Sequence, residues 1–209
     1  MPLGNAFFGE DEMTVKKRVM GWGVAALALM TLWCAAPSDA HEGHAGDMLT
    51  FLETRVALKG MLPEGGKVVR RKQQVSEQGV DWARRELGVD LEPSLYTFYL
   101  SRDAGGTILG AALILEVPYS HGQVRLGVGV DAAGHVTQAA VLGMHGKYVP
   151  ELLVSLRRGW LPQLEGKSLA ELGRMAADTP ERDAAAREIL RRLHRMGAVL
   201  ATLQLSVPS

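Results

Sequence analysis

The chain has 209 residues, and its 23 Lys and Arg balance 23 Asp and Glu, so the formal net charge at pH 7 is zero. This balance argues against a nucleic-acid-binding protein, which normally carries a basic excess. A hydrophobic content of 47% is too high for a disordered chain, and a single cysteine excludes a disulfide scaffold. The composition predicts one globular domain.

The first forty residues have the pattern of an export signal. Three basic residues at 16–18 precede an uncharged apolar run over 19–36, and small residues follow at Ser38 and Ala40. This pattern predicts cleavage after Ala40 and a periplasmic protein. Met13 is an alternative start, because the segment before it is polar and acidic. The other interpretation is an uncleaved helix that anchors the protein to the inner membrane, since the apolar run is just long enough to span a bilayer.

The predicted exported part contains no cysteine, because Cys34 lies inside the apolar run. Residues 41–209 therefore cannot form a disulfide, a thiolate nucleophile, a cysteine-ligated iron–sulfur cluster or a covalent haem site. Any redox role must use a bound organic cofactor or a metal held by His and carboxylates. We expect a signal peptide at 1–40, a His-containing tail and helix at 41–66, and a folded domain at 67–209.

Helical spacing of apolar residues predicts a first helix over 48–61. A short basic strand is expected at 68–75. Ser76 is placed to cap a helix that ends at Leu87, and Gly88 is placed to stop it.

The middle of the chain predicts an antiparallel meander. Alternating or continuous apolar residues indicate strands at 95–102, 108–117, 124–130 and 136–142. Glycine-containing turns at 103–106 and 131–134 join them in two hairpins.

The last third of the chain is expected to be helical. A short helix is predicted at 148–156 and a break at 162–166. Thr179 and Pro180 predict the start of the last long helix, with a hydroxyl cap and a proline in the first turn. One apolar stripe follows on that helix, made of Ile189, Leu193, Met196, Leu200 and Leu203. The predicted fold class is α+β, an antiparallel β-meander sheet covered by helices, with a long C-terminal helix.

Two motifs in this predicted domain are similar to those of a known family. The hairpin sequence VRLGVGVDAAGHV lies at 124–136 and LEGKS at 164–168, and Gly110, Tyr119 and His145 are further counterparts of the family's residues. Residues 68–203 thereby resemble the periplasmic FMN-binding domain of small flavoprotein subunits in Rnf- and Nqr-type electron-transport complexes and related regulators. The resemblance implies an electron-transfer or accessory protein more than a catalyst, with periplasmic or membrane redox proteins as partners.

The chain departs from this family at the covalent flavin site. The family has a Ser/Thr-Gly-Ala-Thr run just before the terminal helix, where this chain reads ADTPER at 177–182. Covalent attachment is therefore not supported, and Thr179 is expected to be a helix cap. Two possibilities stay open: FMN is held noncovalently, or the chain has lost it and serves as a flavin-free assembly or partner-binding module.

Noncovalent FMN needs cationic groups or a helix N-terminus for its phosphate, and a flat apolar or aromatic surface for its ring. The candidate residues for these roles are His145, Gly146, Lys147, Tyr148, Trp160, Lys167 and Thr179. The alternative is that Tyr148 and Trp160 pack beneath a loop while both lysines are solvated.

A second candidate site is the sequence HEGH at 41–44. After cleavage at Ala40, His41 has a free α-amine beside its imidazole, and together they can chelate Cu(II) or Ni(II) with Glu42 and His44 in reach. The spacing is not the H-E-x-x-H of zinc proteases. The alternative is a solvated chain end. No arrangement typical of a hydrolase stands out in the sequence.

Overall fold

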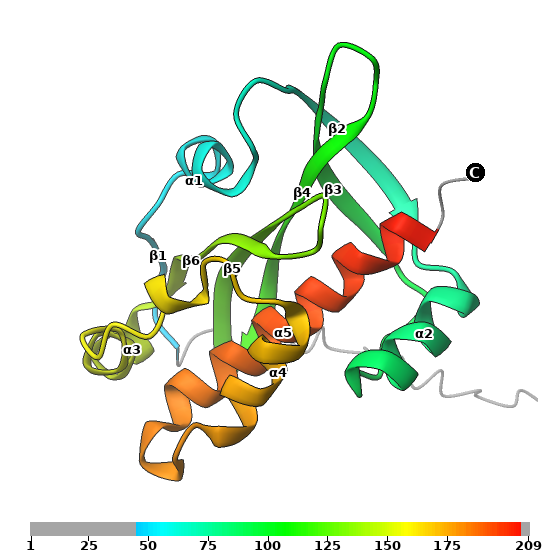
Figure 1. Cartoon of the computed structure of the whole chain (residues 1–209). Coiled ribbons are helices and arrows are strands. Elements are labelled where there is room, and N and C mark those ends of the chain that lie inside the picture. The colour runs from blue at the N-terminus through cyan, green and yellow to red at the C-terminus, as the bar shows by residue number, and fades with distance from the viewer. Residues whose placement is uncertain (1–44, 206–209) are drawn as a thin grey trace, which may run out of the picture. The chain divides into compact units, whose positions relative to one another are not determined.

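The computed structural model describes residues 45–205, and side chains as far as Leu203. The predicted signal segment and the HEGH sequence lie outside these residues. One antiparallel sheet has the strand order β1-β6-β5-β4-β3-β2 (Figure 1). Its strands are β1 Met48–Thr50, β2 Lys67–Gln74, β3 Leu95–Arg102, β4 Ile108–Tyr119, β5 Gly122–Asp131 and β6 Val136–His145.

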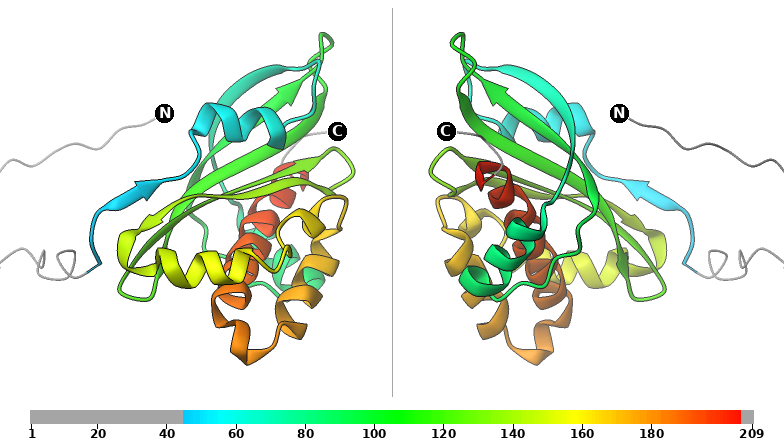
Figure 2. Two further views of the ribbon diagram at one scale, coloured as in Figure 1. Left: turned by 90° about the vertical axis from the view of Figure 1, so that its left-hand side faces the viewer. Right: turned by 90° about the vertical axis from the view of Figure 1, so that its right-hand side faces the viewer.

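The helices cover both faces of this sheet unequally (Figure 2). The helices are α1 Thr54–Met61, α2 Glu77–Leu87, α3 Val149–Leu156, α4 Leu169–Asp178 and α5 Ala184–Leu205, with short 3-10 turns η2 Gly146–Tyr148, η3 Pro162–Leu164 and η4 Glu181–Asp183. One face carries α1, and the other carries α2 to α5. The predicted α+β class, with a meander and a long C-terminal helix, is confirmed. Within residues 45–205, no helix combines the length and apolar character needed to cross a membrane.

The main core lies between the sheet and α5, as the apolar patterns predict. Phe98 of β3, Leu126 of β5 and Ile189 of α5 are all essentially inaccessible to solvent. The predicted stripe on α5 is buried along its length. The caps of α2 are also confirmed, because Ser76 Oγ accepts a hydrogen bond from the Gly79 N–H at 3.1 Å, and Gly88 ends the helix in a left-handed conformation.

A second, smaller core holds α1 against the opposite face. There Met61 packs onto β5 at Gly127 and Gly129. A β-carbon at Gly129 would lie 2.2 Å from the Met61 carbonyl oxygen, which also accepts a hydrogen bond from the Thr137 hydroxyl. The alternate glycines of β5 are therefore required where α1 ends against the sheet.

The predicted helix over 48–61 is wrong in its first part. Met48–Thr50 forms β1, which pairs antiparallel with the end of β6 from His145 to Gly143. The helix begins only at Thr54. An apolar segment next to a free sheet edge gains backbone hydrogen bonds as a strand, and local periodicity cannot anticipate that partner.

The prediction that Thr179 opens the last helix is also wrong. Thr179 is the C-cap of α4, and its hydroxyl donates to the Met175 carbonyl at 2.6 Å. The long helix starts at Ala184, after the η4 turn. Helix α4 is not among the predicted elements, although Ser168 and Glu171 have the spacing of a capping box and form one here.

Candidate functional site

The seven residues predicted to hold FMN do not meet at one place. His145–Tyr148 follow the end of β6, whereas Lys167 lies at its start, where its carbonyl accepts a hydrogen bond from the Val136 N–H at 2.8 Å. Because β6 is ten residues long, these groups are about 30 Å apart. Trp160 follows α3 and Thr179 ends α4. The structure therefore does not assemble them into one pocket.

Tyr148 packs inside the protein below the β4–β5 turn. Its side chain is buried, and its hydroxyl accepts a hydrogen bond from the His121 N–H at 3.1 Å. The Ser120 side chain, which also hydrogen-bonds this hydroxyl, is the largest cause of a lowered Tyr148 pKa, with smaller contributions from the His121 N–H and from Lys147. Lys147 Nζ lies 5.8 Å from the ring centre. Tyr148 thus holds the turn in place, as the packing alternative describes.

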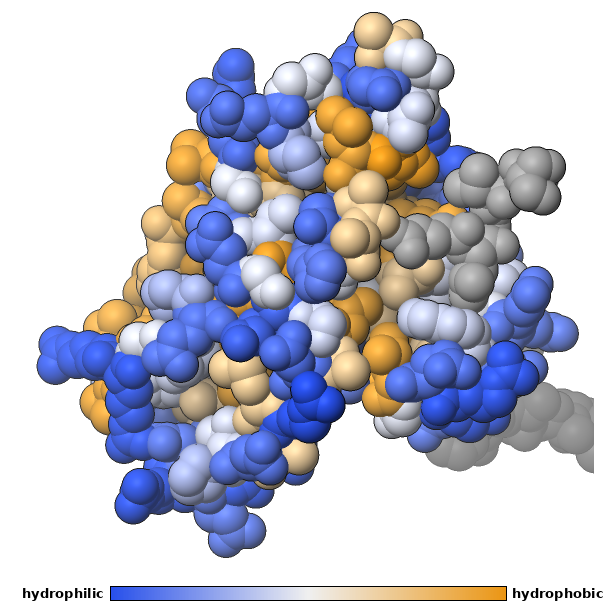
Figure 3. Space-filling model, viewed as in Figure 1, coloured by the Kyte–Doolittle hydropathy of each residue, from blue (hydrophilic) through white to orange (hydrophobic). Residues whose placement is uncertain are grey.

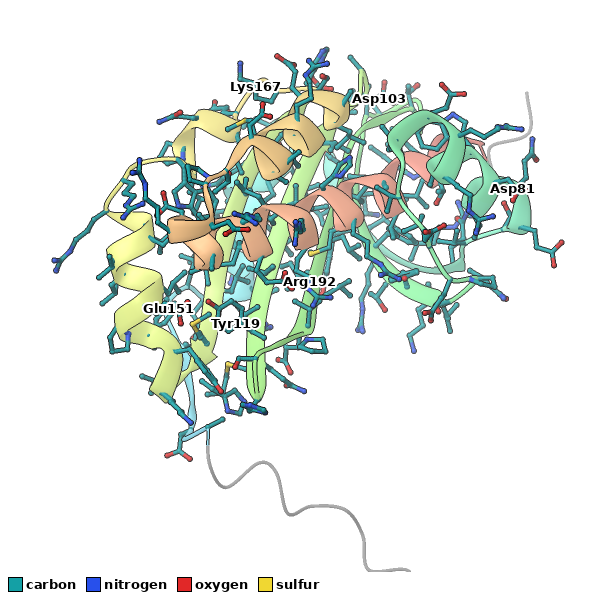
Figure 4. The ribbon with its side chains drawn as sticks, turned by 90° about the horizontal axis from the view of Figure 1, so that it is seen from below. Asp81, Asp103, Tyr119, Glu151, Lys167 and Arg192 are labelled. Atoms are coloured by element: carbon teal, nitrogen blue, oxygen red, sulfur yellow. The ribbon has the colours of Figure 1, made fainter. Side chains whose placement is uncertain are left out.

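Tyr119 at the end of β4 packs beside it. The two rings meet edge to face, with centroids 5.5 Å apart. The Tyr119 hydroxyl donates to Glu151 Oε1 of α3 at 3.1 Å, and Figure 4 shows these two side chains close together. Burial, followed by the negative charge of Glu151, raises the Tyr119 pKa well above its usual value. The space near Tyr148 is therefore filled by the protein's own aromatic and acidic side chains.

The remaining predicted residues also have partners within the protein. The Trp160 Nε1–H lies 3.1 Å from the Ser155 carbonyl oxygen, to which it donates. Lys167 Nζ lies 3.6 Å from Glu171 Oε1. The carbonyl of Thr179 accepts a hydrogen bond from Arg187 Nε at 3.0 Å. In contrast, the buried Nδ1 of His145 has no hydrogen-bond partner within the described part of the chain.

A cavity of about 460 Å³ lies elsewhere, between the sheet and the C-terminal half of α5. Its floor is one row of apolar side chains across three strands, because Leu100 pairs with Ala111 and Ala111 with Val130. Leu200 and Leu203 of α5 form the opposite wall. None of these residues is among the predicted site residues, since each one also fits an ordinary core pattern.

The rim of this cavity is charged. Arg71 of β2 and Arg102 of β3 supply two guanidinium groups, opposed by the carboxylate of Asp131. Asp131 is already engaged by its own turn, where Oδ1 accepts from the backbone N–H groups of Ala133 and His135, both at 2.9 Å. Arg102 donates one hydrogen bond to the Gly106 carbonyl at 2.6 Å. The other N–H donors of the planar Arg102 guanidinium group stay available for an anion.

The size and lining of the cavity fit a small molecule with an apolar ring and an anionic group. Small-molecule sites have volumes of about 300–1000 Å³ and apolar walls with a few polar groups. An Arg pair suits a phosphate or carboxylate, because each guanidinium can donate two parallel hydrogen bonds. A strand irregularity between Ser101 and Arg102 lies at the rim, where such bulges commonly redirect a side chain.

The predicted metal ligands His41, Glu42 and His44 lie outside the described residues. Among residues 45–205, no group of three or more His, Cys, Asp or Glu side chains is arranged to hold a metal ion.

The comparisons with known proteins do not identify relatives. No protein-family model matches the chain, and neither the curated proteins nor the solved structures contain a match. Membership in the FMN-binding family therefore stays a prediction from the sequence motifs.

Proposed function

We propose that this chain is an exported accessory protein of electron transfer that binds FMN noncovalently, in the cavity between α5 and the sheet. The observation that carries the proposal is the combination of an apolar floor of suitable size with two arginines on its rim. The motif resemblance is the reason for choosing FMN as the ligand, and the export pattern is the reason for placing the protein outside the cytoplasm. The proposed site differs from the residues selected by sequence, none of which lines this cavity.

The proposed roles follow from the chemistry of the lining. Arg71 and Arg102 would hold the phosphate through charge-assisted hydrogen bonds. Leu100, Ala111 and Val130 would exclude water from one face of the ring. When bound, FMN would supply the one- and two-electron chemistry. The protein would orient the ring and influence its electronic properties by burying it away from water.

Titration of the purified protein with FMN, followed by flavin fluorescence and absorbance, tests this proposal. We expect binding to weaken at least about tenfold in Arg71→Glu, because a charge-assisted hydrogen bond contributes about 1.5–3 kcal/mol. Arg70→Glu is the matched control, since Arg70 directly precedes Arg71 on β2 and its side chain faces away from the cavity. Riboflavin, which lacks the phosphate, should bind more weakly than FMN and respond less to Arg71→Glu.

Two results would refute the flavin site. One is the absence of FMN binding to the wild-type protein, and the other is equal weakening by both arginine substitutions. The first result would favour the second candidate function, a flavin-free partner-binding module. One observation supports that candidate: Leu153 and Val154 of α3 are adjacent, apolar and about half exposed. In Figure 3, apolar residues on the visible face gather in separate patches among hydrophilic ones.

A further inference from the structure

The strand β2 forms one edge of the sheet and presents an open side. It pairs with β3 along all eight of its residues, from Lys67 with Arg102 to Gln74 with Leu95. In an antiparallel pair, alternate residues direct their N–H and C=O groups away from the partner strand. Within residues 45–205, no hydrogen bond from outside β3 reaches the backbone of β2. The outward backbone groups are therefore free to pair with a further strand.

The side chains of this edge are strongly basic. The sequence KVVRRKQQ has four cations, Lys67, Arg70, Arg71 and Lys72, and no acidic residue, and six of its eight positions are exposed. None of the four cations forms an ion pair in the described part of the chain. Like charges oppose pairing of this edge with a second copy of itself, and they favour an acidic strand.

A pocket adjoins the beginning of the same edge. A cavity of about 750 Å³ separates α1 from β2, and apolar residues Leu58, Leu62 and Val68 line it. Val68 is 52% exposed. Because strand side chains alternate between faces, a strand added beside β2 would direct every second side chain toward α1. An apolar side chain near Val68 would then reach this pocket, while Arg55 and Lys59 at its margin add positive charge.

We propose that β2 binds an extended acidic segment of a partner protein by strand addition, with an apolar side chain of that segment in the α1–β2 pocket. In this mode, backbone hydrogen bonds give affinity and pockets for alternate side chains give specificity. The basic residues lie on both faces of the sheet, since Arg71 lines the α5 cavity and Arg70 points to the other side. Basic residues on both faces would flank an added strand from both sides, whereas a flat membrane would contact the residues of one face only. This site shares Arg71 with the flavin cavity, whereas Arg70 and the α1–β2 pocket lie on the other face of the sheet.

The probe for this proposal is a labelled eight-residue peptide of one Leu and seven Glu, so that acidic side chains lie on both faces of the added strand, including the face of Arg70 and Lys72. Fluorescence anisotropy should show binding to the purified protein, and Arg70→Glu with Lys72→Glu should weaken it at least about tenfold. Arg84→Glu with Arg85→Glu makes the same change in net charge on the helix α2, outside the sheet edge, and should leave binding within about twofold of wild type.

A second peptide separates strand addition from attraction between charges alone. N-methylation of alternate residues on the pairing edge keeps every charge and removes the backbone donors. This peptide should bind at least about tenfold more weakly, and the unmodified peptide should slow amide hydrogen exchange in β2. Equal binding of both peptides would overturn the proposal. Binding to anionic lipid vesicles without binding to the peptide would overturn it too. Loss of FMN binding affects neither readout, so the two proposals fail separately.

Discussion

Replacing Gly129 with alanine tests whether the alternate glycines of β5 exist to admit α1. The new methyl group would lie 2.2 Å from the Met61 carbonyl oxygen and 2.6 Å from the Thr137 hydroxyl. The first contact cannot be relieved by rotating a side chain, because the Met61 oxygen belongs to the backbone of α1, and rotating Thr137 to relieve the second would break its hydrogen bond to that oxygen. The end of that helix must move away from the sheet.

The cost can be worked out from these contacts. Overpacking in a close-packed core costs about 1–3 kcal/mol, and loss of the hydrogen bond from Thr137 to Met61 adds about 0.5–1.5 kcal/mol. We expect Gly129→Ala to lower the free energy of unfolding by about 2–4 kcal/mol. For a domain of this size, each kcal/mol lowers the melting temperature by about 2–4 °C.

Urea unfolding followed by circular dichroism measures this change. Gly105→Ala is the matched control, because a methyl group there meets only the Asp103 carboxylate, at 3.4 Å. The control should change the free energy of unfolding by less than about 0.5 kcal/mol. Equal unfolding midpoints for wild type and Gly129→Ala would refute the packing argument, and so would equal loss in both variants.

Two further predictions concern the helical layer. Ser168→Ala removes the capping box of α4 and should lower the free energy of unfolding by about 1 kcal/mol in the same assay, whereas an unchanged midpoint would contradict the role of this cap. Tyr119 has a raised pKa in the folded protein, chiefly through burial, so its contribution to stability is complete below about pH 10 and is lost as pH rises through the folded-state pKa. Unfolding midpoints measured at pH 9 and pH 11 should therefore fall more steeply for the wild type than for Tyr119→Phe, and parallel losses would exclude this linkage.

Most regular elements could be predicted because their signals are local. The strands β3 to β6 follow from apolar alternation and glycine turns, and α2 follows from Ser76 and Gly88. Helix α4 could also have been found, since Ser168 and Glu171 carry its capping box. In contrast, β1 depends on pairing with Gly143–His145, a partner almost a hundred residues further along the chain. Local spacing contains no information on such a partner.

The candidate site was much less accessible to prediction than the fold. Tyr148 follows His145 closely in the sequence and Lys167 belongs to the LEGKS motif, yet the two residues lie at opposite ends of β6. The cavity beside α5 combines Leu100, Ala111 and Val130, which come from three strands and each match a core pattern. Only the register of the sheet makes them one surface.

The sequence by itself determined the α+β class, the meander, the buried stripe of the terminal helix and the absence of thiol chemistry from residues 41–209. These properties depend on residue type and on spacings of a few residues, which the chain carries wherever it folds. Tertiary structure decided which face α1 covers, which strand edge stays open, and which arginines share a cavity. Those outcomes depend on the pairing and packing of segments distant in the sequence, because burial and hydrogen bonding are satisfied only when the whole sheet is assembled.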